Sequence, residues 1–171
     1  MVQFRRITGI TVKKTPSVSF TQRGGWWVLA QMPILAQAVA IPWWTGIRHF
    51  DPSAGWPWVG AVLVAVGFFI TVAGLLTLGD ALTPFPHPLV TANLHRQGIY
   101  RFLRHPIYAG MVYAAFGWTL MWMSPAGILS AALTTVFFDF KARREELWLR
   151  QQYKDYDHYT QHAKKFLPGI Y

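Results

Sequence analysis

Long uncharged runs dominate the pattern of hydrophobic and polar positions along this chain. No Lys, Arg, Asp or Glu lies between Arg23 and Arg48, and tryptophan pairs bracket the apolar run at 26–45. A second uncharged run covers 57–79, and a third extends from 106 to 138. A transmembrane helix needs about 20 mostly apolar residues. The pattern therefore predicts helices that span a membrane.

The third run is too long for one ordinary span and contains a break. Ser124-Pro125-Ala126-Gly127 lies inside it, and Pro ends a helix while Gly permits a turn. We therefore expect two spans, at 106–123 and 126–140, joined by a tight hairpin near Pro125. With the earlier runs, this predicts an all-α integral-membrane bundle of about four transmembrane helices.

The distribution of positive charge favours four spans over three. The chain is 53% hydrophobic and only 13% charged, yet its net charge is +9. Of 16 Lys and Arg residues, five lie in 1–25, three in 80–105 and seven in 141–171. Four spans place these fifteen on one side, which the positive-inside rule identifies as cytoplasmic, whereas three spans would place the last seven outside. We expect both termini, and a C-terminal helix, on the cytoplasmic side of a prokaryotic inner membrane.

Several other classes of protein fit the chain poorly. A cleaved signal peptide ending near Ala40 is disfavoured because 23 residues precede the first uncharged stretch, far more than a usual n-region holds. The basic residues flank the spans instead of forming one face, so a nucleic-acid partner is not expected. There is no Cys, and His158 and His162 lack a third ligand nearby, so no metal site is expected.

Candidate chemistry lies in the two predicted cytoplasmic segments. Pro106 suits the first turn of a helix, whose open amides attract anions, and Arg104 and His105 stand beside it. Glu145 and Glu146 are the only glutamates and follow the last apolar run. The residues alone also allow structural roles for these groups, namely an Arg104 that snorkels to the membrane interface, a His105 that caps the helix, a Tyr108 that is an interface aromatic, and surface pairs of the two Glu with neighbouring Arg.

Together, these segments resemble a known family. The pattern Gly98-x-Tyr100-Arg101-x-x-Arg104-His105-Pro106-x-Tyr108-x-Gly110, a hydrophobic hairpin, and then Glu145-Glu146-x-x-Leu149 and Tyr156-x-x-Tyr159 is similar to the isoprenylcysteine carboxyl methyltransferase family. Integral-membrane phospholipid methyltransferases are relatives of that family. The resemblance covers roughly 75–168.

The resemblance implies an enzyme that transfers a methyl group from S-adenosylmethionine to a lipophilic or lipidated acceptor at the cytoplasmic membrane face. A carboxylate beside that cationic cofactor would favour its binding. The implied cofactor-binding residues are Tyr100, His105, Pro106, Tyr108, Gly110, Glu145 and Glu146. The implied catalytic residues are Arg104 and Glu146, and His162 is the implied substrate-binding residue.

The sequence leaves the acceptor and some alternatives open. Carboxylate, thiol, phenol and amine nucleophiles all suit such a site, so a phospholipid or small-thiol methyltransferase remains possible. A non-catalytic membrane assembly protein of the same fold is a second alternative. A membrane reductase with a nicotinamide cofactor is a third, although such enzymes are much longer.

Overall fold

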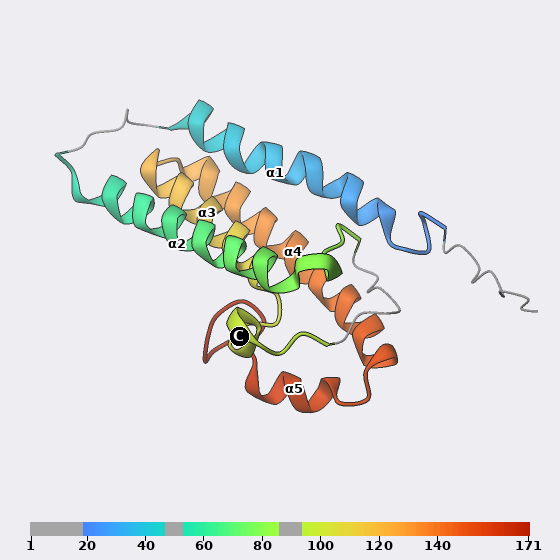
Figure 1. Ribbon diagram of the computed structural model, residues 1–171. Helices are drawn as coiled ribbons and strands as arrows, with labels where there is room; N and C mark the ends of the chain where they lie inside the picture. The colour runs from blue at the N-terminus through green and yellow to red at the C-terminus, as the bar shows by residue number, and fades with distance from the viewer. Residues whose placement is uncertain (1–18, 47–52, 86–93) are drawn as a thin grey trace, which may run out of the picture.

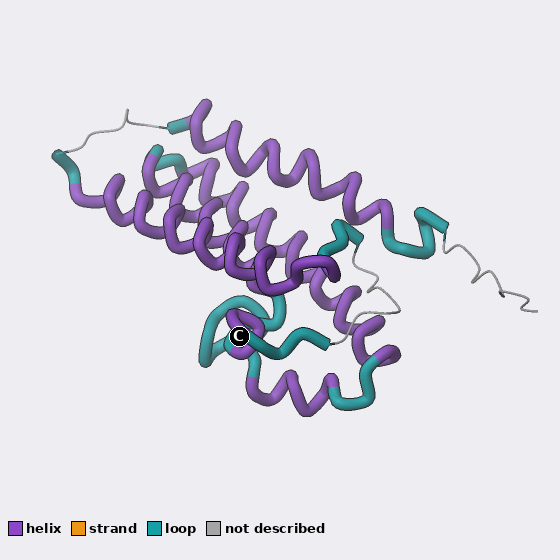
Figure 2. Tube along the Cα trace, viewed as in Figure 1, coloured by secondary structure: helices purple, strands orange, loops and turns teal. Residues whose placement is uncertain are grey.

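The computed structural model describes residues 19–46, 53–85 and 94–171, and in these the regular elements are all helices, joined by turns and loops (Figures 1 and 2). Its elements are α1 (Gly25–Thr45), α2 (Gly55–Leu78), η1 (Gly79–Ala81), η2 (Gly98–Arg101), α3 (Pro106–Met121), α4 (Pro125–Gln152) and α5 (Tyr156–His162). α1 to α4 run alongside one another, and α5 lies below them at one end (Figure 1). The predicted all-α fold is confirmed.

Two pairs of glycines bring the backbones of α2 and α3 into direct contact. A Cβ atom added to Gly67 would lie 2.4 Å from the carbonyl oxygen of Gly110. One added to Gly117 would lie 2.6 Å from the carbonyl oxygen of Gly60. Real Cβ contacts are never so short, so only glycine fits at these positions. Small residues of this kind are typical of close helix pairs in membranes.

Hydrogen bonds between side chains join α1 to α4. The Gln37 amide nitrogen donates to the Thr134 hydroxyl at 3.1 Å, and the Ser130 hydroxyl donates to the Gln37 carbonyl oxygen, Oε1, at 2.6 Å. These groups lie in the middle of α1 and in the apolar first half of α4, where an unpaired polar group would be costly. They fix the position of α1 along α4.

A short turn connects α3 to α4. Met123 has a φ of 46°, and Ser124 caps α4 by accepting a hydrogen bond from the Gly127 amide at 2.8 Å. Pro125 occupies the first turn of α4, where its missing N–H costs nothing. α4 then continues unbroken to Gln152, so the predicted span at 126–140 and the start of the predicted tail form one helix.

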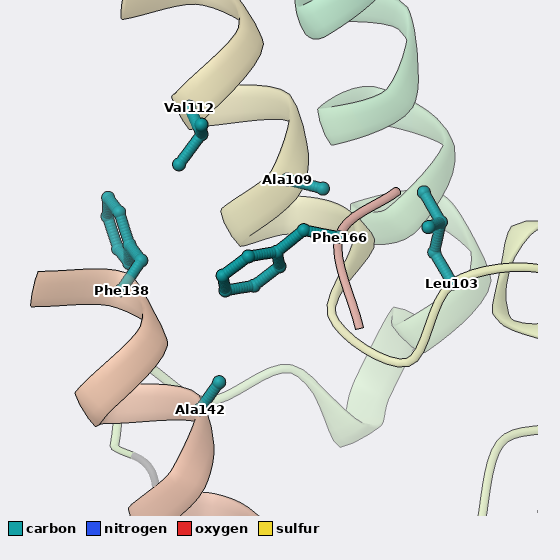
Figure 3. Packing of buried hydrophobic residues seen from close by; sticks show 6 residues of the cluster. All are labelled: Leu103, Ala109, Val112, Phe138, Ala142 and Phe166. Atoms are coloured by element: carbon teal, nitrogen blue, oxygen red, sulfur yellow. The ribbon is translucent and has the colours of Figure 1, made fainter. Parts of the chain in front are cut away.

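The segment after α5 folds back onto the residues before α3. The Arg104 amide donates to the Lys164 carbonyl at 2.7 Å, and the Lys164 amide donates to the Phe102 carbonyl at 3.0 Å. Leu103 and Phe166 are thereby buried with side chains of α3 and α4, as Figure 3 shows. The described members of this core are Leu103, Ala109, Val112, Phe138, Ala142 and Phe166. This core fixes the start of α3 against the middle of α4.

Two of the described helices are long and apolar enough to cross a membrane. They are α1, and α2 continued through η1 as Gly55–Ala81. Their outward faces carry large apolar side chains such as Trp44, 86% exposed, and Leu76, 77% exposed. Such faces suit contact with lipid better than contact with water.

Candidate functional site

A cavity of about 350 Å³ lies where α2 ends and α3 begins. α2, α3 and α4 contribute wall residues, α1 contributes Gln31, and the segments at 81–85 and 94–100 and α5 complete it. One part of the wall is apolar and includes Leu75, Leu78, Ile107 and Met111. The rest carries titratable side chains. The cavity therefore joins an apolar region to a polar one.

Glu146 is the centre of a buried ionic cluster behind the cavity wall. Its Oε1 accepts a hydrogen bond from Arg104 Nε at 2.9 Å and lies 3.2 Å from His105 Nε2. Burial alone would raise the pKa of Glu146, but the hydrogen bond from His105 and the charges of His105 and Arg104 lower it to about 2. Glu146 is therefore ionised at neutral pH, and it ties α4 to the two residues that precede α3.

Arg104 is also hydrogen-bonded to the backbone at the C-terminal end of α5. One of its terminal nitrogens donates to the Ala163 carbonyl at 2.6 Å and lies 3.4 Å from the Thr160 carbonyl. Arg104 lines the cavity. Since its Nε and this nitrogen both bond to protein atoms, the guanidinium holds the start of α3 against α4 and α5.

Glu145 differs from its neighbour because its side chain reaches the cavity. It accepts a hydrogen bond from the Tyr108 hydroxyl at 2.8 Å and lies 3.8 Å from His105 Nδ1. Its side chain is 26% exposed, against 6% for Glu146. The ring of Tyr108 stacks on that of His105, with 3° between their planes. Glu145 thus presents a carboxylate to any molecule that enters the cavity.

Three buried tyrosines form another side of the cavity. The Tyr159 hydroxyl donates to the Tyr100 carbonyl at 2.6 Å, which connects α5 to η2. The Tyr156 hydroxyl is buried and has no hydrogen-bond partner among the described residues. Burial raises the pKa of Tyr156, so its hydroxyl stays protonated. Tyr156 lines the cavity, and its hydroxyl is a buried polar group without a partner among the described residues, an exception in folded proteins.

The first turn of α3 has backbone N–H groups that are available as hydrogen-bond donors. Ala109 makes the first helical hydrogen bond, to the His105 carbonyl at 2.9 Å. The amides of Ile107 and Tyr108 precede it and have no partner in the described part of the chain. Both residues line the cavity. Open amides at a helix N-terminus bind carboxylates and phosphates.

The structure brings most of the predicted site residues together. Five of them line the cavity, namely Tyr100, Arg104, His105, Tyr108 and Glu145. Glu146 lies behind the wall, and Pro106 is buried with its ring toward Gly74 of α2.

Two predicted residues lie elsewhere. Gly110 faces α2, where an added Cβ would lie 2.4 Å from the Gly67 carbonyl, so its missing side chain serves helix packing. His162 is exposed on α5, with its Nδ1 3.1 Å from the His158 carbonyl, and it is not part of the cavity wall. In the described residues no three His, Asp or Glu side chains cluster as metal ligands.

Lys141 is a cavity residue that the sequence did not indicate. It is only 2% exposed, lines the cavity and donates a hydrogen bond to Gln31 Oε1 of α1. In the sequence, Lys141 is the first of the basic residues that follow the last apolar run, so it looks like an ordinary charge at the end of a span. Its spacing was the available signal, because residues four apart share one helix face and Lys141 lies four before Glu145.

Comparison with known proteins gives a consistent result. The sequence pattern of the phospholipid methyltransferase family matches residues 56–156. A rice (Oryza sativa subsp. indica) protein described as "Probable protein-S-isoprenylcysteine O-methyltransferase" is 32% identical over an alignment of 124 positions, and the match covers 66% of this chain and 61% of that protein. The Dictyostelium discoideum protein-S-isoprenylcysteine O-methyltransferase is 28% identical over an alignment of 123 positions, and the match covers 67% of this chain and 50% of that protein.

A third relative is protein-S-isoprenylcysteine O-methyltransferase A of Arabidopsis thaliana, which is 32% identical over an alignment of 111 positions, and the match covers 57% of this chain and 53% of that protein. The chain thus matches between half and about six tenths of the length of these relatives. No solved structure matches it. The family pattern covers more than half of the chain, including the start of α3 and the Glu145–Glu146 pair. The chain belongs to the phospholipid methyltransferase family, the group of methyltransferases that its Arg-His-Pro and Glu-Glu segments resemble.

Proposed function

We propose that this protein is an S-adenosylmethionine-dependent methyltransferase that acts on a lipophilic acceptor. The observation that carries the proposal is the accessible carboxylate of Glu145 in a cavity that is also lined by Ile107 and Tyr108, whose amides are open, and by Tyr156, whose hydroxyl has no partner among the described residues. A cationic amino-acid nucleoside carries the groups that match these three features. Family membership supports the same activity.

The residues of the cavity fit this cofactor, which supplies an activated methyl group when it is bound. Glu145 would pair with its positively charged part, because opposite charges attract strongly in a site shielded from water. The amides of Ile107 and Tyr108 would hold its carboxylate. The Tyr156 hydroxyl would bond to one of its polar groups. Arg104 and Glu146 hold these elements in register, so we assign them a positioning role.

The apolar part of the wall supports a lipophilic acceptor. Leu75 and Leu78 of α2 and Ile107 and Met111 of α3 line it. These residues lie on helices whose outer faces are apolar. We propose that α1 to α4 all enter the membrane, that both termini are cytoplasmic, and that the cavity lies at the cytoplasmic face. The basic residues at the cavity end would then lie toward the cytoplasm.

Binding of S-adenosylhomocysteine to the detergent-solubilised protein, measured by isothermal titration calorimetry, tests the proposal. We expect wild type to bind, and E145Q to bind at least about tenfold more weakly, since it loses a hydrogen-bonded charge. D80N is the matched control, because Asp80 is an exposed carboxylate that is not part of the cavity wall. Absence of binding by folded wild type would contradict the proposal and favour a non-catalytic role. If E145Q binds S-adenosylhomocysteine as tightly as wild type does, Glu145 is not part of the cofactor site.

A further inference from the structure

Lys141 is a buried cation in the wall of the cavity. It lies on α4, one turn before Glu145, and its ammonium donates to Gln31 Oε1 of α1. Its Nζ is 3.5 Å from the Pro84 carbonyl and 5.1 Å from the centre of the Tyr108 ring. Residues from three separate parts of the chain therefore hold this one amine in place.

No carboxylate of the described residues forms an ion pair with Lys141, although Glu145, one turn further along α4, favours its charged form from a greater distance. Glu146 neutralises Arg104 at 2.9 Å, but within the described residues no carboxylate lies within 4 Å of Lys141 Nζ. An ammonium has three N–H donors, and in the described part of the chain two acceptors contact this one, the Gln31 amide oxygen and the Pro84 carbonyl. One donor and one positive charge thus remain for a molecule in the cavity.

Burial without an ion pair is costly for a cation. It lowers the pKa of Lys141 to about 8, although Glu145 acts in the opposite direction. Lys141 lies just beyond the predicted span at 126–140, and at neutral pH it is mostly protonated. A bound anion would supply the missing partner.

We infer that Lys141, held by Gln31, makes the cavity select acceptors that react as anions over acceptors that react as amines. The inference rests on the proposed methyl transfer. It names the acceptor class as a lipophilic molecule with an acidic group, namely a carboxylate, thiolate or phenolate. Glu145 would balance the cationic cofactor, whereas Lys141 would balance the acceptor.

The charges of the reaction agree with this assignment. The acceptor anion attacks the methyl carbon, a bond from oxygen or sulfur to that carbon forms, and the carbon–sulfonium bond breaks. The electron pair of the broken bond stays on the sulfur, which thereby becomes a neutral thioether. The negative charge of the acceptor and the positive charge of the sulfonium therefore disappear together. No proton needs to be removed from an acceptor that is already an anion. An amine acceptor would instead enter as a cation and be repelled by Lys141.

Gln31 lies outside the region that the family pattern matches, residues 56–156. α1 therefore contributes to this wall from a part of the chain that family membership does not describe. Its amide oxygen accepts from Lys141, and this bond directs the ammonium along the wall. Gln31 is thus a positioning residue for the selectivity that we infer.

Binding of two probes of equal chain length, dodecanoate and dodecylamine, tests the inference. Both are titrated into the protein in a nonionic detergent at pH 7, with and without S-adenosylhomocysteine. We expect wild type to bind dodecanoate at least about tenfold more tightly than dodecylamine, the size of one charge-assisted hydrogen bond. In K141M this preference should disappear, while affinity for S-adenosylhomocysteine stays within about twofold. K141R should keep the preference.

K154M is the control for net charge, because Lys154 is exposed and outside the cavity wall. Equal binding of the two probes by wild type, or an unchanged preference in K141M, would overturn the inference. The wild-type preference alone decides the matter if K141M does not fold. Failure of S-adenosylhomocysteine to bind would instead contradict the proposed function, and the probes without it would still test Lys141.

Discussion

Glu145 and Glu146 are neighbours in the sequence but face different surroundings. Successive residues of an α-helix point about 100° apart, so α4 directs one carboxylate into the cavity and the other behind its wall. Glu145 contacts the Tyr108 hydroxyl, whereas Glu146 contacts Arg104 and His105. The first is available to a ligand. The second holds the protein together, and the two roles are separable by mutation.

We expect E146Q to destabilise the protein by about 3 kcal/mol, because it leaves the buried Arg104 without its counter-charge. The pKa of Glu146 is lowered to about 2. Its charge therefore adds stability above the ordinary glutamate pKa near 4.5, and this contribution is lost as the pH falls toward 2. Thermal unfolding from pH 7 to pH 3 measures the difference between wild type and E146Q. The difference should be full at neutral pH and should shrink below about pH 4.5. A difference that does not change with pH would contradict this account.

The sequence indicated the acids of the site better than its other groups. Two adjacent glutamates in a chain with few charges are conspicuous, and so is an Arg-His-Pro sequence at a helix start. Lys141 was not found, since a Lys that follows an apolar run has an ordinary explanation as an orienting charge. The motif around Gly110 predicts a place in the cofactor pocket. The position of Gly110, facing α2, depends on how two helices pack, which no local pattern shows.

At the scale of elements, the contact between α2 and α3 determines where the cavity forms. Backbone contact at Gly67 and Gly110 leaves no room for even one methyl group. The same contact places the end of α2 beside Pro106, whose ring lies 3.1 Å from a Cβ added at Gly74. The wall residues of α2 and α3 therefore keep their positions only while the two helices stay close.

We expect G67A to destabilise the protein by about 2 kcal/mol, because overfilling a tight contact forces the backbones apart. Its new methyl group would lie 2.4 Å from the Gly110 carbonyl oxygen and 2.7 Å from the Ala114 nitrogen. G55A is the matched control, since nothing lies within 4 Å of an added Cβ there, and it should change stability by less than about 0.5 kcal/mol. Thermal unfolding in detergent compares the two variants. Equal effects would show that the contact between α2 and α3 is not tight.

The bounds of the helices were largely predictable, with one difference. α3 begins at Pro106 as expected, and α4 begins at Pro125, one residue before the expected 126. The sequence did not predict that α4 continues to Gln152, because the change from apolar to charged residues near Lys141 marks a membrane boundary rather than a helix end. No Gly or Pro lies between 128 and 152, so nothing in the chain interrupts the helix there.

At the scale of the whole molecule, the site lies where apolar helices meet charged segments. Its wall joins Gln31, Leu75, Tyr108, Lys141 and Tyr156, which are far apart in the sequence. The fold-back of the C-terminal segment onto the residues before α3 closes this arrangement. A cavity at such a boundary can receive a polar cofactor from water and an apolar acceptor from the bilayer. Access of this kind requires that the chain crosses the membrane with the cavity end of the helices at the cytoplasmic face.

Labelling of single cysteines tests this arrangement, and the absence of natural cysteines removes any background. Ser19→Cys and Gln161→Cys probe the cavity end, and Gly55→Cys and Ala126→Cys probe the opposite end. With four spans and cytoplasmic termini, a membrane-impermeant maleimide added to intact cells should label only the latter pair. The first pair should react only after the membrane is permeabilised. Labelling of Gln161→Cys in intact cells would place the tail outside and contradict the positive-inside assignment. Protection of Ala126→Cys alone would instead show that α3 and α4 enter the bilayer as a hairpin without crossing it.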